Sequence, residues 1–137
     1  MRLLENKTDE EEYTKFLENH ERCNFQQSLE WARVKTSWKR KVILAEDENK
    51  KIIGSLMVWI RKIPIFGNIM YSSTGPVCDI HNMEVLKQIN EGIQELAKKY
   101  NAIVIRIEPD IVSSDENFRN IMIDLGYQIK DDAKNFR

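Results

Sequence analysis

Hydrophobic residues recur every three or four positions in three segments of the chain, which is the spacing of one helix face. The strongest pattern lies between Asn82 and Tyr100 and includes Val85, Leu86, Ile89, Ile93, Leu96 and Ala97. Shorter patterns follow two capping boxes, in which Thr or Ser precedes Glu by three positions, at Thr8–Glu11 and Ser113–Glu116. We predict helices at about 9–20, at about 82–100 and before Gly126, and a further short helix after the N-cap residue Ser28.

Runs of apolar residues predict the strands. Segments 41–46 and 51–61 flank the polar turn 47–50 and form a predicted hairpin. The second strand is apolar on both faces, with Ile52, Leu56, Val58 and Ile60 on one and Ile53, Met57 and Trp59 on the other. Such a strand is typical of a sheet covered on both sides. Further strands are predicted at 68–73 and 102–107, joined by the 82–100 helix as a right-handed parallel crossover, and a last strand begins at 127–130.

The predicted order is ααβββαβαβ, an α/β fold with a mixed β-sheet flanked by helices. It matches the GNAT-like (acyl-CoA N-acyltransferase-like) architecture, in which neighbouring strands splay to leave a cleft. The length of 137 residues suits a single domain, residues 1–137. The glycine-rich loop that holds the coenzyme A pyrophosphate in that superfamily is missing, since the five glycines are spread singly. Coenzyme A is therefore disfavoured.

Composition excludes several classes of partner. The 21 Lys and Arg residues nearly balance the 22 Asp and Glu residues, so the net charge of −1 gives no reason to expect nucleic acid or an acidic membrane as a bulk electrostatic partner. Cys23 and Cys78 have no metal-ligand spacing and suggest free thiols in a reducing cytosol. No apolar run is long enough for a transmembrane segment. We expect no metal and no cofactor.

Lys35 stands out because it shares a helical face with Trp31, Val34 and Trp38, at positions i, i+3, i+4 and i+7 of the helix after Ser28. An unpaired ammonium within an apolar stripe is costly. Lys35 must reach water along its stem, pair with a carboxylate, or face an anionic ligand. The structural alternative, with indoles in the core and the lysine stem lying over them, stays open.

Four blocks, FQQSLEWARVK, IIGSLMV, GPVCD and IRIEPD, in this order and at these distances, resemble the Fem (FemA/FemB/FemX-like) peptidoglycan aminoacyltransferases. The similarity begins near residue 24. It implies transfer of an amino acid from aminoacyl-tRNA to the stem peptide of a peptidoglycan precursor. It also implies that this chain is the first of two GNAT-like halves and contributes to precursor binding. A cytoplasmic location follows, either in bulk or peripheral at the inner face of the membrane.

The resemblance also implies roles for particular residues. Lys35 would contact the phosphates of the precursor, whether a uridine-diphosphate sugar or a lipid-linked pyrophosphate, and Trp38 would form a wall of that pocket. From its position at the carboxyl end of the predicted strand 102–107, near the cleft, Glu108 is a candidate acid that positions or deprotonates the acceptor amine. The structural alternative is an ion pair with Arg106, two residues away on the same strand face. Family members often carry a basic residue where this chain has Thr74, so a contact made by that basic side chain is not expected in this chain.

Other residues with reactive side chains are expected to be structural. His20 and His81 are interpreted as surface residues, Cys78 as a buried thiol, and Ser72 and Ser73 as lacking a nucleophile elbow. Two alternatives to the aminoacyltransferase remain: a non-catalytic GNAT-like binding or scaffold module, and an acyl-coenzyme A N-acetyltransferase. We expect the isolated chain to bind precursor weakly and to turn over nothing, because the second half should complete the cleft.

Overall fold

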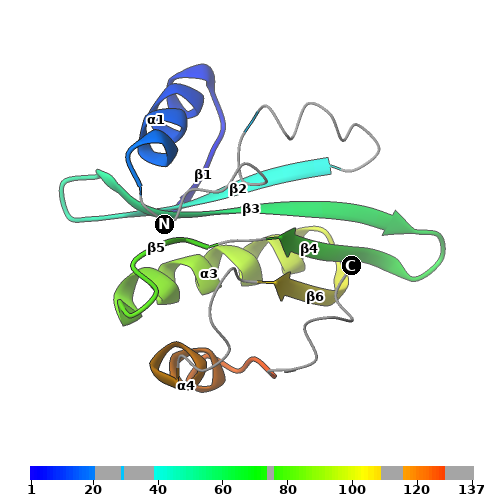
Figure 1. Ribbon diagram of the computed structural model, residues 1–137. Coiled ribbons are helices and arrows are strands. Elements are labelled where there is room, and N and C mark those ends of the chain that lie inside the picture. The colour runs from blue at the N-terminus through cyan, green and yellow to red at the C-terminus, as the bar shows by residue number, and fades with distance from the viewer. Residues whose placement is uncertain (21–28, 30–38, 74–75, 109–115, 129–137) are drawn as a thin grey trace.

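The computed structural model describes residues 1–20, 29, 39–73, 76–108 and 116–128 (Figure 1). The helices in these ranges are α1 (Lys7–Glu18), α3 (Met83–Lys99) and α4 (Glu116–Asp124). The strands are β1 (Arg2–Leu3), β2 (Lys39–Glu46), β3 (Ile52–Ile63), β4 (Gly67–Ser73), β5 (Val77–Cys78) and β6 (Ala102–Glu108). Every predicted helix and strand whose residues fall mainly within the described ranges is present, with ends shifted by a few residues, except the strand predicted at 127–130.

The sheet has the order β1-β2-β3-β4-β6, and β5 pairs with β3 beside this path. The β2–β3 and β3–β4 ladders are antiparallel, whereas β4 and β6 are parallel, as the helical crossover between them requires. The parallel arrangement predicted for segments 68–73 and 102–107 is thus confirmed. Figure 1 shows α1 on one face of the sheet and α3 with α4 on the other.

Three features of the sheet differ from the sequence prediction. Strands β1 and β5 were not predicted, because two residues are too few to show a periodic pattern. The splay expected between neighbouring strands is not seen between β4 and β6 within the described ranges, since these two strands stay paired up to Ser73 and Glu108. The strand predicted at 127–130 is wrong at Tyr127 and Gln128, which are not in a strand, and its other residues lie outside the described ranges.

Two hydrophobic cores cover the two faces of the sheet. The core on the α3 and α4 side includes Ile43, Leu56, Met70, Leu96 and Phe118. The core on the α1 side includes Tyr13, Leu17, Val42, Met57 and Trp59. Strand β3 contributes to both cores, which confirms that a strand apolar on both faces lies in a covered sheet.

The predicted faces of Ile52 and Ile53 are wrong. Ile52 belongs to the α1-side core, and Ile53 packs against the α3-side core. The reason is a bulge: Ala45 pairs with Gly54 but Glu46 pairs with Ile52, so one extra residue enters β3. An extra residue reverses the alternation of side chains beyond it.

The helix caps decide where the helices begin and end. Helix α1 starts after Asn6, whose side chain accepts from the Asp9 N–H at 2.9 Å, so the capping box predicted at Thr8 is wrong.

Helix α4 ends as predicted at Gly126, where φ is +100° and the Tyr127 N–H reaches the Met122 carbonyl at 3.0 Å. The Tyr127 hydroxyl then donates to Asn90 Oδ1 at 2.6 Å and joins the end of α4 to α3. Burial raises the pKa of Tyr127 to about 12.

Arg2 joins β1, α1 and β2. Its guanidinium contacts Glu46 at 2.8 Å, Glu12 at 3.1 Å and Asp9. The hydrogen bond to Glu46, together with the Asp9 contact, raises the pKa of Arg2 above its ordinary range. The Glu5 backbone N–H, at 3.0 Å, and the Arg2 guanidinium lower the pKa of the buried Asp9 carboxyl below 3.8, although burial opposes this shift.

We predict that Asp9→Asn lowers the free energy of unfolding at neutral pH by about 1–3 kcal/mol, because a charge-assisted contact is lost. A carboxyl with a lowered folded-state pKa stabilises the fold above its ordinary pKa, and this contribution disappears as the pH falls through the folded value. The stability curves of the wild type and of Asp9→Asn should therefore converge below pH 3.8. Urea unfolding across pH measures this. Glu11→Gln, on the exposed side of α1, is the control, and equal acid sensitivity of wild type and Asp9→Asn would contradict the assignment.

Candidate functional site

The carboxyl ends of the parallel strands β4 and β6 bring two polar residues into register. Ser73, the last residue of β4, pairs with Glu108, the last residue of β6. In open α/β sheets, ligands bind outside the carboxyl ends of the strands. This edge is therefore the candidate catalytic end of the domain.

Strand β4 leaves its antiparallel partner just before this edge. Its ladder with β3 ends at the pair Trp59–Tyr71, although β4 continues to Ser73. Ser72 is buried, and its hydroxyl donates to the Met57 carbonyl at 2.7 Å. That hydroxyl is engaged in holding β4 against β3, which fits its interpretation as a structural residue.

Of the three predicted site residues, the structure describes the position of Glu108 but not those of Lys35 and Trp38. Lys35 and Trp38 lie outside the described ranges. The backbone of Glu108 is placed at the carboxyl end of β6, as expected from the sequence. Arg106, two residues earlier, is exposed and pairs in register with Tyr71.

A cationic cluster that the sequence does not predict surrounds the ring of Tyr100. The ammonium groups of Lys39, Lys99 and Lys41 lie 5.0, 5.7 and 6.0 Å from the ring centroid. Among the residues that the structure describes, none of these ammonium groups forms an ion pair with a carboxylate. Three like charges around one aromatic ring create a positive potential that suits an anion.

The cationic cluster lies far along the strand from Glu108. Tyr100 lies two residues before the start of β6, whereas Glu108 is the last residue of that strand. The three consecutive basic residues Lys39, Arg40 and Lys41 divide between the two faces of the sheet. Lys39 and Lys41 point to the α3 side, and Arg40 points to the α1 side, where it lies 3.8 Å from Glu10. The sequence signal for the cluster was incomplete because Lys99 and Tyr100 come from a different element.

An open, shallow pocket of about 790 Å³ lies at the end of α1 and the β2–β3 turn. Its lining includes Lys15, Phe16, His20, Lys50 and Lys51. The rings of Phe16 and His20 lie 5.3 Å apart, so this histidine packs at the end of α1. The lining also includes Glu12, and none of the lining residues is a serine, threonine or cysteine.

The remaining reactive residues occupy structural positions. Cys78 is fully buried in the α3-side core, which agrees with its interpretation as a buried thiol. His81 is exposed, and its backbone N–H donates to the Asp79 carboxylate at 3.0 Å. Within the described ranges, no group of three or more His, Cys, Asp or Glu side chains is placed to hold a metal ion.

Comparison with known families shows to which family the chain belongs. Residues 8–134 match the model of the FemAB family. The chain belongs to this family. Its curated relatives include the UDP-N-acetylmuramoylpentapeptide-lysine N(6)-alanyltransferase of Weissella viridescens, 30% identical over 118 residues. They also include a lipid II:glycine glycyltransferase of Staphylococcus saprophyticus, 30% identical over 100 residues.

The match covers most of this FemAB chain but a minor part of each relative. It covers 85% of this chain and 34% of the alanyltransferase, and 70% of this chain and 24% of the glycyltransferase. The chain therefore spans about a third or less of the length of these curated relatives.

Solved structures give the same family and the same fold. The crystal structure of FemX superposes with a TM-score of 0.81 at 25% identity, over 93% of this chain and 32% of FemX. A probable acetyltransferase superposes with a TM-score of 0.69 at 11% identity, over 100% of this chain and 96% of that chain, and this likeness concerns the fold alone. The predicted GNAT-like fold class is confirmed. No helix in the described part of this FemAB chain has both the length and the apolar character needed to cross a bilayer.

Proposed function

We propose that this FemAB chain is the precursor-binding domain of an aminoacyltransferase. The complete enzyme would transfer an amino acid from aminoacyl-tRNA to the stem peptide of a peptidoglycan precursor. The observation that carries this proposal is the family match over residues 8–134, together with relatives named for transfer to lipid II and to a UDP-linked muramoylpentapeptide. Residues 1–137 would be the first GNAT-like half, with a second half completing the cleft and the tRNA site.

The reaction would place modest demands on the side chains of this domain. An amine of the precursor attacks the ester carbonyl of aminoacyl-tRNA, the C–N bond forms, and the tRNA hydroxyl leaves with a proton. Because the ester is already activated, alignment of the reactants and stabilisation of the developing charge supply most of the catalysis. Glu108, at the carboxyl end of β6, would position the amine or accept its proton.

Precursor binding is assigned to Lys35 and Trp38 on the basis of the family resemblance. The ammonium of Lys35 would pair with a phosphate that the ligand supplies, and the indole of Trp38 would shield that contact from water. With a lipid-linked precursor the enzyme would work at the inner face of the membrane as a peripheral protein. A uridine-diphosphate precursor would not require that location.

Titration calorimetry with uridine-diphosphate-muramyl pentapeptide tests the proposal, and coenzyme A is the competing ligand class. We expect weak binding of the pentapeptide and none of coenzyme A. Lys35→Ala should weaken pentapeptide binding by about 1–3 kcal/mol, because a charge-assisted contact is lost. Lys51→Ala, which removes an exposed cation from the β2–β3 turn, should have no effect.

Each other outcome points to a different function. Tighter binding of coenzyme A would favour an N-acetyltransferase, whose fold this domain shares. Binding of neither ligand would favour a scaffold module. Pentapeptide binding that Lys35→Ala leaves unchanged would remove Lys35 from the site. Aminoacyl transfer by the isolated chain would contradict the requirement for a second half.

A further inference from the structure

The turn between β3 and β4 carries the most exposed apolar side chains described in the protein. Ile65 is 99% exposed and Phe66 is 66% exposed. We call residues Pro64–Phe66 the hairpin tip. Figure 1 shows the hairpin extending past the helices on the right of the view, so the tip projects from the body of the domain. Two large apolar side chains at such a point contribute little to the core.

The backbone of the hairpin tip would suit glycine better than isoleucine. The Phe66 N–H donates to the Ile63 carbonyl at 3.2 Å, which closes a four-residue turn with Pro64 in its second position. Ile65, in the third position, has a φ of +77°. Turns of this type favour glycine there, and a β-branched residue at such a φ is a genuine outlier. Folding alone therefore does not explain an isoleucine at the third position of the turn.

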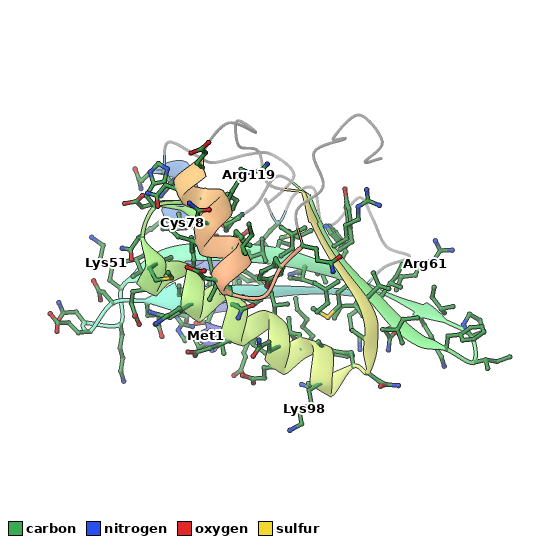
Figure 2. The ribbon with its side chains drawn as sticks, turned by 90° about the horizontal axis from the view of Figure 1, so that it is seen from below. Met1, Lys51, Arg61, Cys78, Lys98 and Arg119 are labelled. Atoms are coloured by element: carbon green, nitrogen blue, oxygen red, sulfur yellow. The ribbon has the colours of Figure 1, made fainter. Side chains whose placement is uncertain are left out.

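Cationic side chains gather at the end of the sheet that carries the tip. Arg61 and Lys62 are exposed on β3 next to the tip, and Lys39 pairs in register with Ile60. Figure 2 shows Arg61 at the opposite end of the molecule from Lys51. The sequence contains no Asp or Glu between Ile52 and Cys78, so every charged side chain of the β3–β4 hairpin is cationic.

The lysines near the tip also share one face of the sheet. Met70 lies in the α3-side core and pairs with Ile60, and Lys62 lies two residues beyond Ile60 on the same face. Lys39 is the cross-strand partner of Ile60, and its ammonium lies over the ring of Tyr100 with that of Lys99. The cationic cluster thus continues toward the hairpin tip on the α3 side.

We propose that the hairpin tip docks this domain on an anionic membrane surface. Ile65 and Phe66 would enter the boundary between headgroups and acyl chains, while Lys62, Lys39 and the other lysines of the cluster would bind lipid phosphates. A small apolar anchor next to several cations is the combination that gives reversible binding to anionic bilayers. A protein partner fits less well, since a stable protein interface buries about 1,200 Å² or more. Combined with the proposed function, on which this last step rests, such docking selects a lipid-linked precursor over a soluble one.

Sedimentation with vesicles of equimolar phosphatidylglycerol and phosphatidylcholine tests the docking surface without any precursor. Ile65→Gly should reduce vesicle binding on the order of tenfold, because its apolar side chain is lost from the interface. The same change suits φ at position 65, so thermal stability should stay equal or rise. Lys62→Gln should reduce binding about fivefold, equivalent to about 1 kcal/mol per cation.

Two control variants test whether the loss of vesicle binding is specific to the hairpin tip. Ile123→Ser removes a half-exposed isoleucine from α4, and Lys51→Gln removes a cation from the opposite end of the sheet. Both should bind vesicles like the wild type. Equal binding by wild type and Ile65→Gly, equal binding to pure phosphatidylcholine, or no vesicle binding would each overturn the proposal. Failure here would leave pentapeptide binding by calorimetry intact, so the two proposals fail separately.

Discussion

Replacing Gly92 with valine is expected to lower the free energy of unfolding by about 3 kcal/mol. Gly92 lies in the buried face of α3, and a Cβ atom at this position would approach Ile43 Cγ2 to 2.5 Å and Cγ1 to 2.9 Å. Ile43 is fully buried and belongs to the α3-side core. The helix would have to shift away from β2, and the α3-side core would loosen along its length.

Urea unfolding of wild type and Gly92→Val measures this loss. Glu91→Val is the matched control, because it places the same β-branched side chain on the adjacent, exposed position of the helix. The free energy of unfolding of that variant should fall by less than about 1 kcal/mol, because only the lower helix propensity of valine acts there. Similar losses in the two variants would show that the close approach of α3 to β2 does not limit the size of residue 92.

Met70→Ala is expected to lower the free energy of unfolding by about 2–5 kcal/mol, because the loss of a buried Met leaves a cavity. Met70 is 1% exposed and lies in β4 between Ile60 of β3 and Ile105 of β6. It therefore fills the α3-side core where the antiparallel and parallel parts of the sheet join. The same strand leads to Ser73 at the candidate catalytic edge, so the change should also loosen that edge.

The control is Met83→Ala, which makes the same substitution at the first residue of α3, where the side chain is 36% exposed. It should change stability by no more than about 0.5 kcal/mol. Thermal and urea unfolding report the stability of both variants, and amide exchange of β4 and β6 reports the local effect. A loss at Met70 no larger than at Met83 would mean that the core refills the space.

The largest elements could be predicted because they carry long periodic patterns. Helix α3 repeats its apolar positions over more than four turns, and β3 keeps a continuous apolar run. The short strands β1 and β5 exist only because β2 and β3 offer them partners, and two residues cannot signal that in the sequence. The bulge that exchanges the faces of Ile52 and Ile53 likewise depends on how β2 and β3 pair, which alternation within one strand does not encode.

The candidate site, too, could be predicted from the sequence only in part. The place of Glu108 at the end of a strand could be predicted, because the apolar run 102–107 stops before Pro109. Its pairing with Ser73 depends on the parallel register of two strands separated by a helix. The roles of Lys35 and Trp38 stay predictions from the family resemblance, since both residues lie outside the described ranges.

By itself, the sequence determined the fold class, the main helices and strands, and membership of the FemAB family, because these depend on local periodicity and on residue blocks in a fixed order. Only the tertiary structure decided which charged side chains lie close together. Lys39 and Lys99 are 60 positions apart in the sequence numbering, yet both ammonium groups lie over the ring of Tyr100. It also decided that Ile65 and Phe66 project from the end of a hairpin beside cations. Electrostatic and apolar surfaces depend on distances through space, and only the packed sheet fixes those distances.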